Sequence, residues 1–144
     1  MAGHHTKDKG DLGIAKVHAD LVAKGFTILF PATEHAPFDL VAYGAGSFTR
    51  LQVKYRSARS GAVKVQFRSS WADRAGTHST QIDKTSIDAV AIYCPDTDQC
   101  YYVNPLAPGS SVTLCMVSSR NGQRAGVLDA SAFRELPHGW PCSS

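Results

Sequence analysis

Residues 37–56 of this chain, PFDLVAYGAGSFTRLQVKYR, decide the fold. Two apolar segments, 37–43 and 48–56, flank the small-residue run 44–47, a pattern typical of an antiparallel hairpin with a tight turn. If Tyr43 and Phe48 pair next to the turn, the numbers of opposed residues add up to 91. Asp39 and Gln52 satisfy this sum. The sequence therefore predicts that they lie opposite each other on one face of a sheet.

Lys54 completes a polar cluster on this predicted face. It follows Gln52 by two residues, so both lie on the same side of the strand, about 6.6 Å apart along it. Leu51, Val53 and Tyr55 occupy the other side of the strand and indicate a sheet that is packed well into the protein. Polar residues at such a place need a reason.

The cluster carries the groups that phosphodiester hydrolysis needs. A hard cation polarises the phosphate and lowers the pKa of the attacking water, and a positive charge stabilises the developing negative oxygens. Asp39, Gln52 and the backbone carbonyl of Val53 offer oxygen ligands of the kind that suits Mg²⁺, and Lys54 offers the charge. An Asp39–Lys54 ion pair with Gln52 hydrogen-bonded between the two is the structural alternative.

A helix is predicted before the hairpin, over Asp8–Gly25. Leu12, Ala15, Ala19 and Val22 recur at helical spacing, and Ile14, Val17 and Leu21 widen the apolar face. Asp8 is the expected N-cap, Asp11 falls in the first turn, and Gly25 is expected to end the helix.

Further strands are predicted at 26–30, 63–67, 87–94, 100–103 and 112–117, and a short closing helix at 131–136. The segments 87–94 and 100–103 form a hairpin around the turn 95–98. Residues 68–85 are polar and rich in Ser, Thr and Gly, so we expect an exposed loop there.

Length and composition set the class of protein. A chain of 144 residues suits one domain, 1–144, that buries a core without metal or disulfide links. It has neither an 18-residue apolar run nor a signal-like start, so we expect a cytoplasmic protein without a membrane partner. Four cysteines without a secretory signal are expected to be reduced thiols.

The net charge is only +3, but the basic residues are concentrated in one segment. Seven of them lie between positions 50 and 74 against the single acid Asp73: Arg50, Lys54, Arg56, Arg59, Lys64, Arg68 and Arg74. Such a segment suits a phosphate backbone, and a solvated basic face is the alternative. The candidate DNA-binding residues are Tyr55, Arg56, Arg59, Arg68 and Arg74, and base contacts are assigned to the 68–84 segment through Arg74, His78 or Gln81.

The strings EHAPFDL (34–40) and QVKYR (52–56), preceded by an amphipathic helix, resemble the core of the PD-(D/E)XK nuclease superfamily. Within it they are similar to the homing endonucleases encoded in cyanobacterial group I introns. The likeness spans about residues 7–105 and leaves 106–144 as a C-terminal extension of a single nuclease domain. It implies an α/β fold with a restriction-endonuclease-like core, a mixed central sheet flanked by helices.

The resemblance also implies roles for the cluster. Asp39, Gln52 and the Val53 carbonyl would hold Mg²⁺, for which Mn²⁺ is expected to substitute, and Lys54 would orient the attacking water and stabilise the transition state. The superfamily usually places Asp or Glu where this chain has Gln52, whereas the intron-encoded branch is similar in using Gln. Members often add an acid from the first helix, which makes Asp11 a further catalytic and metal-binding candidate. An Asp near a helix start also stabilises the helix dipole without any catalytic purpose.

The implied function is metal-dependent cleavage of double-stranded DNA at a specific site. One subunit presents one site, so cutting both strands implies at least a homodimer, and the homing branch implies a tetramer. A Holliday-junction resolvase with the same core, a catalytically silent DNA-binding module, and an unrelated α/β protein with a polar cluster are the alternatives.

Overall fold

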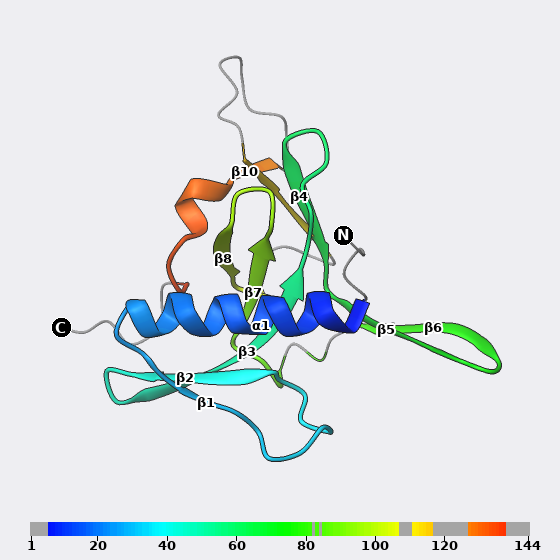
Figure 1. Ribbon diagram of the computed structural model, residues 1–144, viewed down its shortest axis with the longest axis horizontal. Coiled ribbons are helices and arrows are strands. Elements are labelled where there is room, and N and C mark those ends of the chain that lie inside the picture. Colours follow the sequence, from blue (N-terminus) through cyan, green and yellow to red (C-terminus); the bar gives the residue numbers. More distant parts are fainter. Residues whose placement is uncertain (1–5, 82, 84, 107–110, 117–126, 138–144) are drawn as a thin grey trace.

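The computed structural model describes residues 6–81, 83, 85–106, 111–116 and 127–137 (Figure 1). Its centre is a five-stranded sheet in the order β1-β2-β3-β7-β8. The bounds are β1 (Thr27–Leu29), β2 (Leu40–Gly44), β3 (Ser47–Tyr55), β7 (Ala89–Cys94) and β8 (Gln99–Val103). β3 and β7 run parallel and the other neighbours antiparallel, so the sheet is mixed, as predicted.

Helix α1 (Thr6–Ala23) lies across one face of this sheet (Figure 1). Its buried residues Val17 and Leu21 pack with Leu40, Leu51 and other apolar residues of the strands. The helix-facing side of β3 carries Leu51, Val53 and Tyr55, as the alternating sequence predicts.

The other face of the sheet is covered by strands. β4 (Ala62–Gln66), β9 (Ser111–Cys115) and β10 (Val127–Asp129) form a second sheet in the order β10-β9-β4, followed by the 3₁₀ helix η1 (Ala130–Phe133). Val65 of β4 and Leu114 of β9 join Ile92 of β7 in one buried cluster. Part of the predicted C-terminal extension therefore packs into the core, and the short closing helix at 131–136 is a 3₁₀ turn at 130–133.

The start of α1 differs from the prediction. The helix begins at Thr6, so Asp8 lies inside its first turn rather than at the N-cap, and Asp11 lies in the second turn rather than the first. An acid stabilises the positive end of the helix dipole from within the first turn as well, and neither Thr6 nor Lys7 is a helix breaker.

The end of α1 agrees with the prediction. Gly25 has a φ of 95°, and the N–H groups of Gly25 and Phe26 donate to the carbonyls of Val22 and Leu21, both at 3.0 Å. These two bonds form a Schellman motif, which satisfies carbonyls that the helix end leaves without partners.

The β2–β3 hairpin has the predicted register. Leu40 pairs with Leu51 and Tyr43 with Phe48, so the residue numbers add up to 91. Its turn residues Ala45 and Gly46 both have positive φ, 51° and 79°, as a two-residue hairpin turn of type I′ requires.

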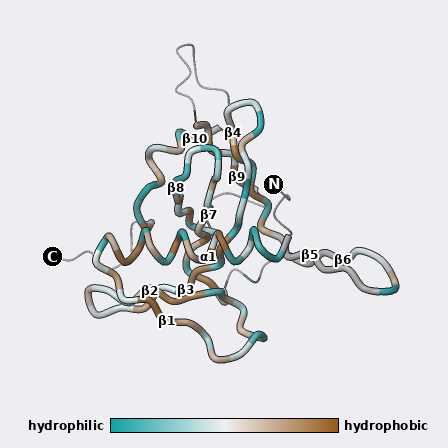
Figure 2. The backbone as a smooth tube through the Cα atoms, in the orientation of Figure 1, coloured by the Kyte–Doolittle hydropathy of each residue, from teal (hydrophilic) through white to brown (hydrophobic). Residues whose placement is uncertain are grey.

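Residues 68–81 form a second hairpin where the sequence predicts a loop. β5 (Arg68–Asp73) and β6 (Gly76–Gln81) pair antiparallel, from Arg68 opposite Gln81 to Asp73 opposite Gly76. The hairpin lacks the strongly hydrophobic colouring of β1 and β2 (Figure 2). Its strands are defined by backbone pairing without an apolar alternation, which is why the sequence pattern missed them.

Candidate active site

Strand β3 places Gln52 and Lys54 on the face away from α1. Their partners across the parallel ladder, Val90 and Ile92, belong to the buried cluster beneath β4 and β9. Lys54 is itself buried, and this burial lowers its pKa to about 8, with a smaller contribution from the nearby charge of Arg56. Attraction to Asp39 acts in the opposite direction and favours the charged amine.

Asp39 lies just beyond the end of the β2–β3 ladder. The last ladder pair is Leu40–Leu51, and the backbone N–H of Asp39 donates to the carbonyl of Leu51 at 2.9 Å. Its carboxylate oxygen Oδ2 accepts a 2.7 Å hydrogen bond from the N–H of Val53. The regular pairing predicted between Asp39 and Gln52 therefore stops one residue short, because the Asp39 side chain takes over the hydrogen bond at this point.

Burial raises the pKa of the Asp39 carboxyl, while the Val53 hydrogen bond and the charge of Lys54 lower it. The predicted cluster is thus brought together: Asp39 is tied to Val53, between Gln52 and Lys54 in the chain, and feels the charge of Lys54.

Oxygen atoms at this place are available to a metal ion. The side-chain oxygen Oε1 of Gln52 is buried and, among the described residues, accepts no hydrogen bond. The structural alternative was an Asp39–Lys54 ion pair bridged by Gln52. It requires this oxygen to accept a hydrogen bond, and none is found among the described residues. A buried carbonyl without a partner is costly, and a cation or a water bound to it would remove that cost.

The backbone carbonyl of Val53 is the third oxygen. In an antiparallel pair the N–H and C=O of one residue point to the same neighbour, and the Val53 N–H points to Asp39. Since β2 begins only at Leu40, the carbonyl lies beside Asp39 with no residue of β2 paired to it. One carboxylate, one amide oxygen and one backbone carbonyl fit Mg²⁺, which usually completes its shell with water and substrate phosphate. No group of three His, Cys, Asp or Glu in the described part of the chain offers another metal site.

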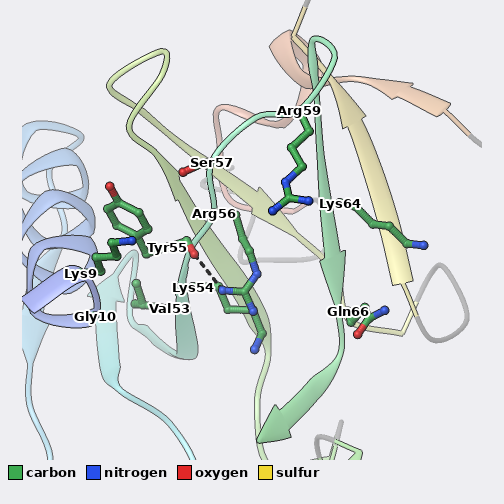
Figure 3. Close-up of a pocket in the computed structure, with 10 residues that line it drawn as sticks. All are labelled: Lys9, Gly10, Val53, Lys54, Tyr55, Arg56, Ser57, Arg59, Lys64 and Gln66. Atoms are coloured by element: carbon green, nitrogen blue, oxygen red, sulfur yellow. Dashed lines mark hydrogen bonds between the residues drawn. The ribbon is translucent and has the colours of Figure 1, made fainter. Parts of the chain in front are cut away.

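A basic cleft of about 770 Å³ opens next to Lys54 (Figure 3). Its lining comes from the start of α1, from the end of β3 and the segment after it, and from β4: Lys9, Gly10, Val53, Lys54, Tyr55, Arg56, Ser57, Arg59, Lys64 and Gln66. Five of these side chains are cationic and none is acidic. Focused positive potential in a cleft attracts a polyanion.

Three of the five predicted DNA-binding residues, Tyr55, Arg56 and Arg59, line this cleft. Arg56 is held by a 2.8 Å hydrogen bond from its guanidinium to the carbonyl of Tyr55, and burial lowers its pKa. Arg68 and Arg74 lie instead on the β5–β6 hairpin, where Arg74 is exposed at the turn.

Asp11 is not brought into the cluster. It is exposed on α1, whereas Gly13 is buried against Val53, and two residues along a helix correspond to a rotation of about 200°. Asp11 therefore faces away from β3.

Sequence reasoning missed Lys9 and Gln66 as cleft residues and named Lys64 only as part of the basic segment. The alternation AVKVQ over residues 62–66 carries a signal for β4, because its polar positions Lys64 and Gln66 must share one exposed face. Nothing in the local sequence of Lys9 relates it to β3, since that contact depends on how α1 crosses the sheet.

The buried cysteines Cys94 and Cys100 are free thiols, as predicted. Among the described helices, none is both long and apolar enough for a membrane crossing.

Comparisons with known proteins identify the family and agree with the fold. The model of the PD-(D/E)XK endonuclease family matches residues 4–136, well beyond the end of the predicted core at residue 105. None of the curated proteins matches the chain. In fold, the chain is similar to the bacterial homing endonuclease I-Ssp6803I, with a TM-score of 0.71 and 19% sequence identity over 91% of this chain and 89% of that chain.

Proposed function

This chain belongs to the PD-(D/E)XK endonuclease family and is a nuclease, and from that premise we propose that it cuts double-stranded DNA at a specific site with the help of a divalent metal ion. One observation carries the proposal: the buried oxygen of Gln52 has no hydrogen-bond partner among the described residues. Gln52 precedes Val53, whose N–H binds Asp39, and lies two residues before the buried cation Lys54.

Three oxygens would hold the metal: the second carboxylate oxygen of Asp39, Oε1 of Gln52 and the carbonyl of Val53. Nucleases of this family generally use divalent ions, and this set of hard oxygen ligands favours Mg²⁺, with Mn²⁺ as a substitute. When bound, the ion would polarise the scissile phosphate and lower the pKa of an attacking water. The Val53 N–H keeps the Asp39 carboxylate oriented, so the site is preorganised before the ion arrives.

Lys54 would supply the positive charge next to the reacting phosphate. With a pKa of about 8 the amine is mostly protonated at neutral pH, and a bound phosphate would favour the protonated form further. In this form it can hydrogen-bond the attacking water and stabilise charge that develops on the phosphate oxygens.

The basic cleft would hold the DNA backbone beside this site. Arg56 and Arg59 follow Lys54 closely in the chain, and Lys9 and Lys64 contribute from two other elements. If these side chains contact one phosphate of the DNA, the next phosphate along the backbone would lie near Lys54. Tyr55 packs its ring against Tyr93 at 5.7 Å and lies 5.9 Å from the Lys9 ammonium, so it supports the cleft wall.

Cutting both strands needs two such sites, because each chain carries one. We therefore propose a homo-oligomer, at least a dimer, with a tetramer as the assembly that a long target would require.

The test is cleavage of a randomised duplex DNA library and of a four-way junction, each with Mg²⁺ or with EDTA. Wild-type protein is compared with Asp39→Asn and with Asp98→Asn, a control that removes an exposed carboxylate paired with Lys16. We expect Mg²⁺-dependent cuts at one duplex sequence, lost in Asp39→Asn and kept in Asp98→Asn. Cutting of the junction alone would reassign the protein as a resolvase. Binding without any cutting would make it a DNA-binding module.

A further inference from the structure

The β5–β6 hairpin stands apart from the rest of the molecule. In Figure 1 it projects sideways, past the first turn of α1, and among the described elements its two strands make their main contacts with each other. A two-stranded hairpin alone in water is marginally stable at best. A projecting ribbon of this kind therefore gains stability when a partner covers it.

The hairpin is continuous with the basic cleft. β5 begins at Arg68, two residues after Gln66 of β4, and Gln66 and Lys64 line the cleft. A duplex whose backbone lies in the cleft would meet the hairpin next.

The register divides the hairpin into two chemically different faces. One face carries the opposed positions Arg68–Gln81, Ser70–Ser79 and Ala72–Thr77. The other face carries Ser69–Thr80, Trp71–His78 and Asp73–Gly76. The first face consists of residue types that contact base edges: Arg pairs with guanine, Gln with adenine, Ser and Thr with several bases, and Ala with the thymine methyl. The second face has the only acid of the hairpin, which would repel phosphates.

We infer that the hairpin enters the major groove of the DNA and reads its sequence through the face of Arg68, Ser70, Ala72, Thr77, Ser79 and Gln81, defined here as the reading face. The major groove, about 12 Å wide, admits a two-stranded ribbon. The inference rests on the proposed function, because it takes duplex DNA as the substrate. It assigns sequence recognition to an element separate from Asp39 and Lys54.

The test uses selection of bound duplexes from a randomised DNA library in EDTA, with the full chain, so that it does not depend on cleavage. Gln81→Ala and Ser79→Ala alter the reading face. Ser69→Ala and Thr80→Ala remove hydroxyl groups from the opposite face of the same strands and serve as controls, with Ser69→Ala matched in size to Ser79→Ala. Circular dichroism confirms that each variant is folded.

We expect Gln81→Ala to reduce discrimination at one base pair of the selected site by roughly tenfold, with a smaller loss at a neighbouring base pair for Ser79→Ala. Both controls should select the wild-type sequence. Equal effects from the two faces, an unchanged site with Gln81→Ala, or no selected sequence at all would each overturn the inference. A change in oligomeric mass in any of these variants would also overturn the inference, because the hairpin would then bind a second copy of the chain. If the wild-type protein selects a DNA sequence in EDTA but cuts no DNA in Mg²⁺, the proposed catalysis is overturned and this inference is not.

Discussion

The carboxylate of Asp39 accepts a 2.7 Å hydrogen bond from the backbone N–H of Val53, a residue 14 positions further along the chain. The bond replaces a ladder hydrogen bond where β2 has ended, and it uses one of the two carboxylate oxygens. The other oxygen is the one that we propose as a metal ligand, together with the carbonyl of Val53 and the buried oxygen of Gln52. One interaction thus ends a hairpin and orients a carboxylate that we propose as a metal ligand.

Gln52→Glu tests whether the buried oxygen of Gln52 belongs to a metal site. A second carboxylate near Asp39 should lower stability in EDTA, because two like charges then share a partly buried place. In Mg²⁺ the extra charge should strengthen ion binding, so we expect a larger rise of the melting temperature than in wild type. Thermal unfolding over a Mg²⁺ titration measures both effects. Gln66→Glu, on the exposed face of β4, is the control. If the two variants respond alike, Gln52 does not bind metal.

Lys54→Met should stabilise the protein at neutral pH. Burial lowers the pKa of Lys54 to about 8 from an ordinary 10.5, so the folded state holds the charged amine at a cost below pH 8. Between about 8 and 10.5 the unfolded chain binds more protons than the folded one, and stability rises with pH until the cost is gone. After discounting for partial contact with water, we expect a gain of about 1–2 kcal/mol at pH 7 that shrinks toward pH 10.

Urea unfolding at several pH values measures this difference, and Lys64→Met, at an exposed position of β4, is the control. If Lys54→Met is less stable than wild type at pH 7, Lys54 raises the free energy of unfolding instead of lowering it, and the prediction is wrong. A more stable Lys54→Met variant would mean that the wild-type protein keeps this buried cation for its function, at the expense of stability.

The hairpin and its cluster were predictable from sequence because both depend on short-range rules. The turn at Ala45 and Gly46 fixes the register, and the register fixes which residues share a face. Leu51, Val53 and Tyr55 alternate with Gln52 and Lys54, so a period of two separates the core side from the polar side. Only the last step failed: Asp39 leaves the ladder because its side chain competes for the Val53 N–H, and no periodic pattern encodes that competition.

The basic cleft could not be assembled from the sequence in the same way. Lys9, Arg56 and Lys64 meet because α1 crosses one end of β3 and β4 packs beyond it, and both arrangements join segments that are far apart in the sequence. The family resemblance likewise implied a role for Asp11 without showing which way it points, which depends on the face of α1 that packs against β3 through Gly13.

Asp11→Asn separates the resemblance from the geometry. The side chain is exposed and faces away from β3, so we expect metal-dependent cleavage within about twofold of wild type. Asp39→Asn should lose roughly a hundredfold or more in the same assay. Single-turnover cleavage at saturating Mg²⁺ compares the two. A loss in Asp11→Asn as large as that in Asp39→Asn would mean that α1 rotates or shifts when DNA binds.

Arg59→Ala and Lys64→Ala test the basic cleft through the salt dependence of binding. A cationic side chain that binds a phosphate releases counterions, so the slope of log affinity against log salt should become shallower by roughly 0.9 for each phosphate that the variant no longer neutralises. We expect this change for both variants with any duplex sequence, because binding to phosphates does not depend on the bases.

Fluorescence anisotropy of a labelled duplex in EDTA, from about 50 to 200 mM KCl, measures the slope. Lys16→Ala is the control: it removes a lysine of α1 that pairs with Asp98 at 2.9 Å and lies outside the cleft. An equal change of slope in Lys16→Ala would mean that general surface charge binds the DNA, whereas unchanged slopes in Arg59→Ala and Lys64→Ala would place the backbone on another face of the protein.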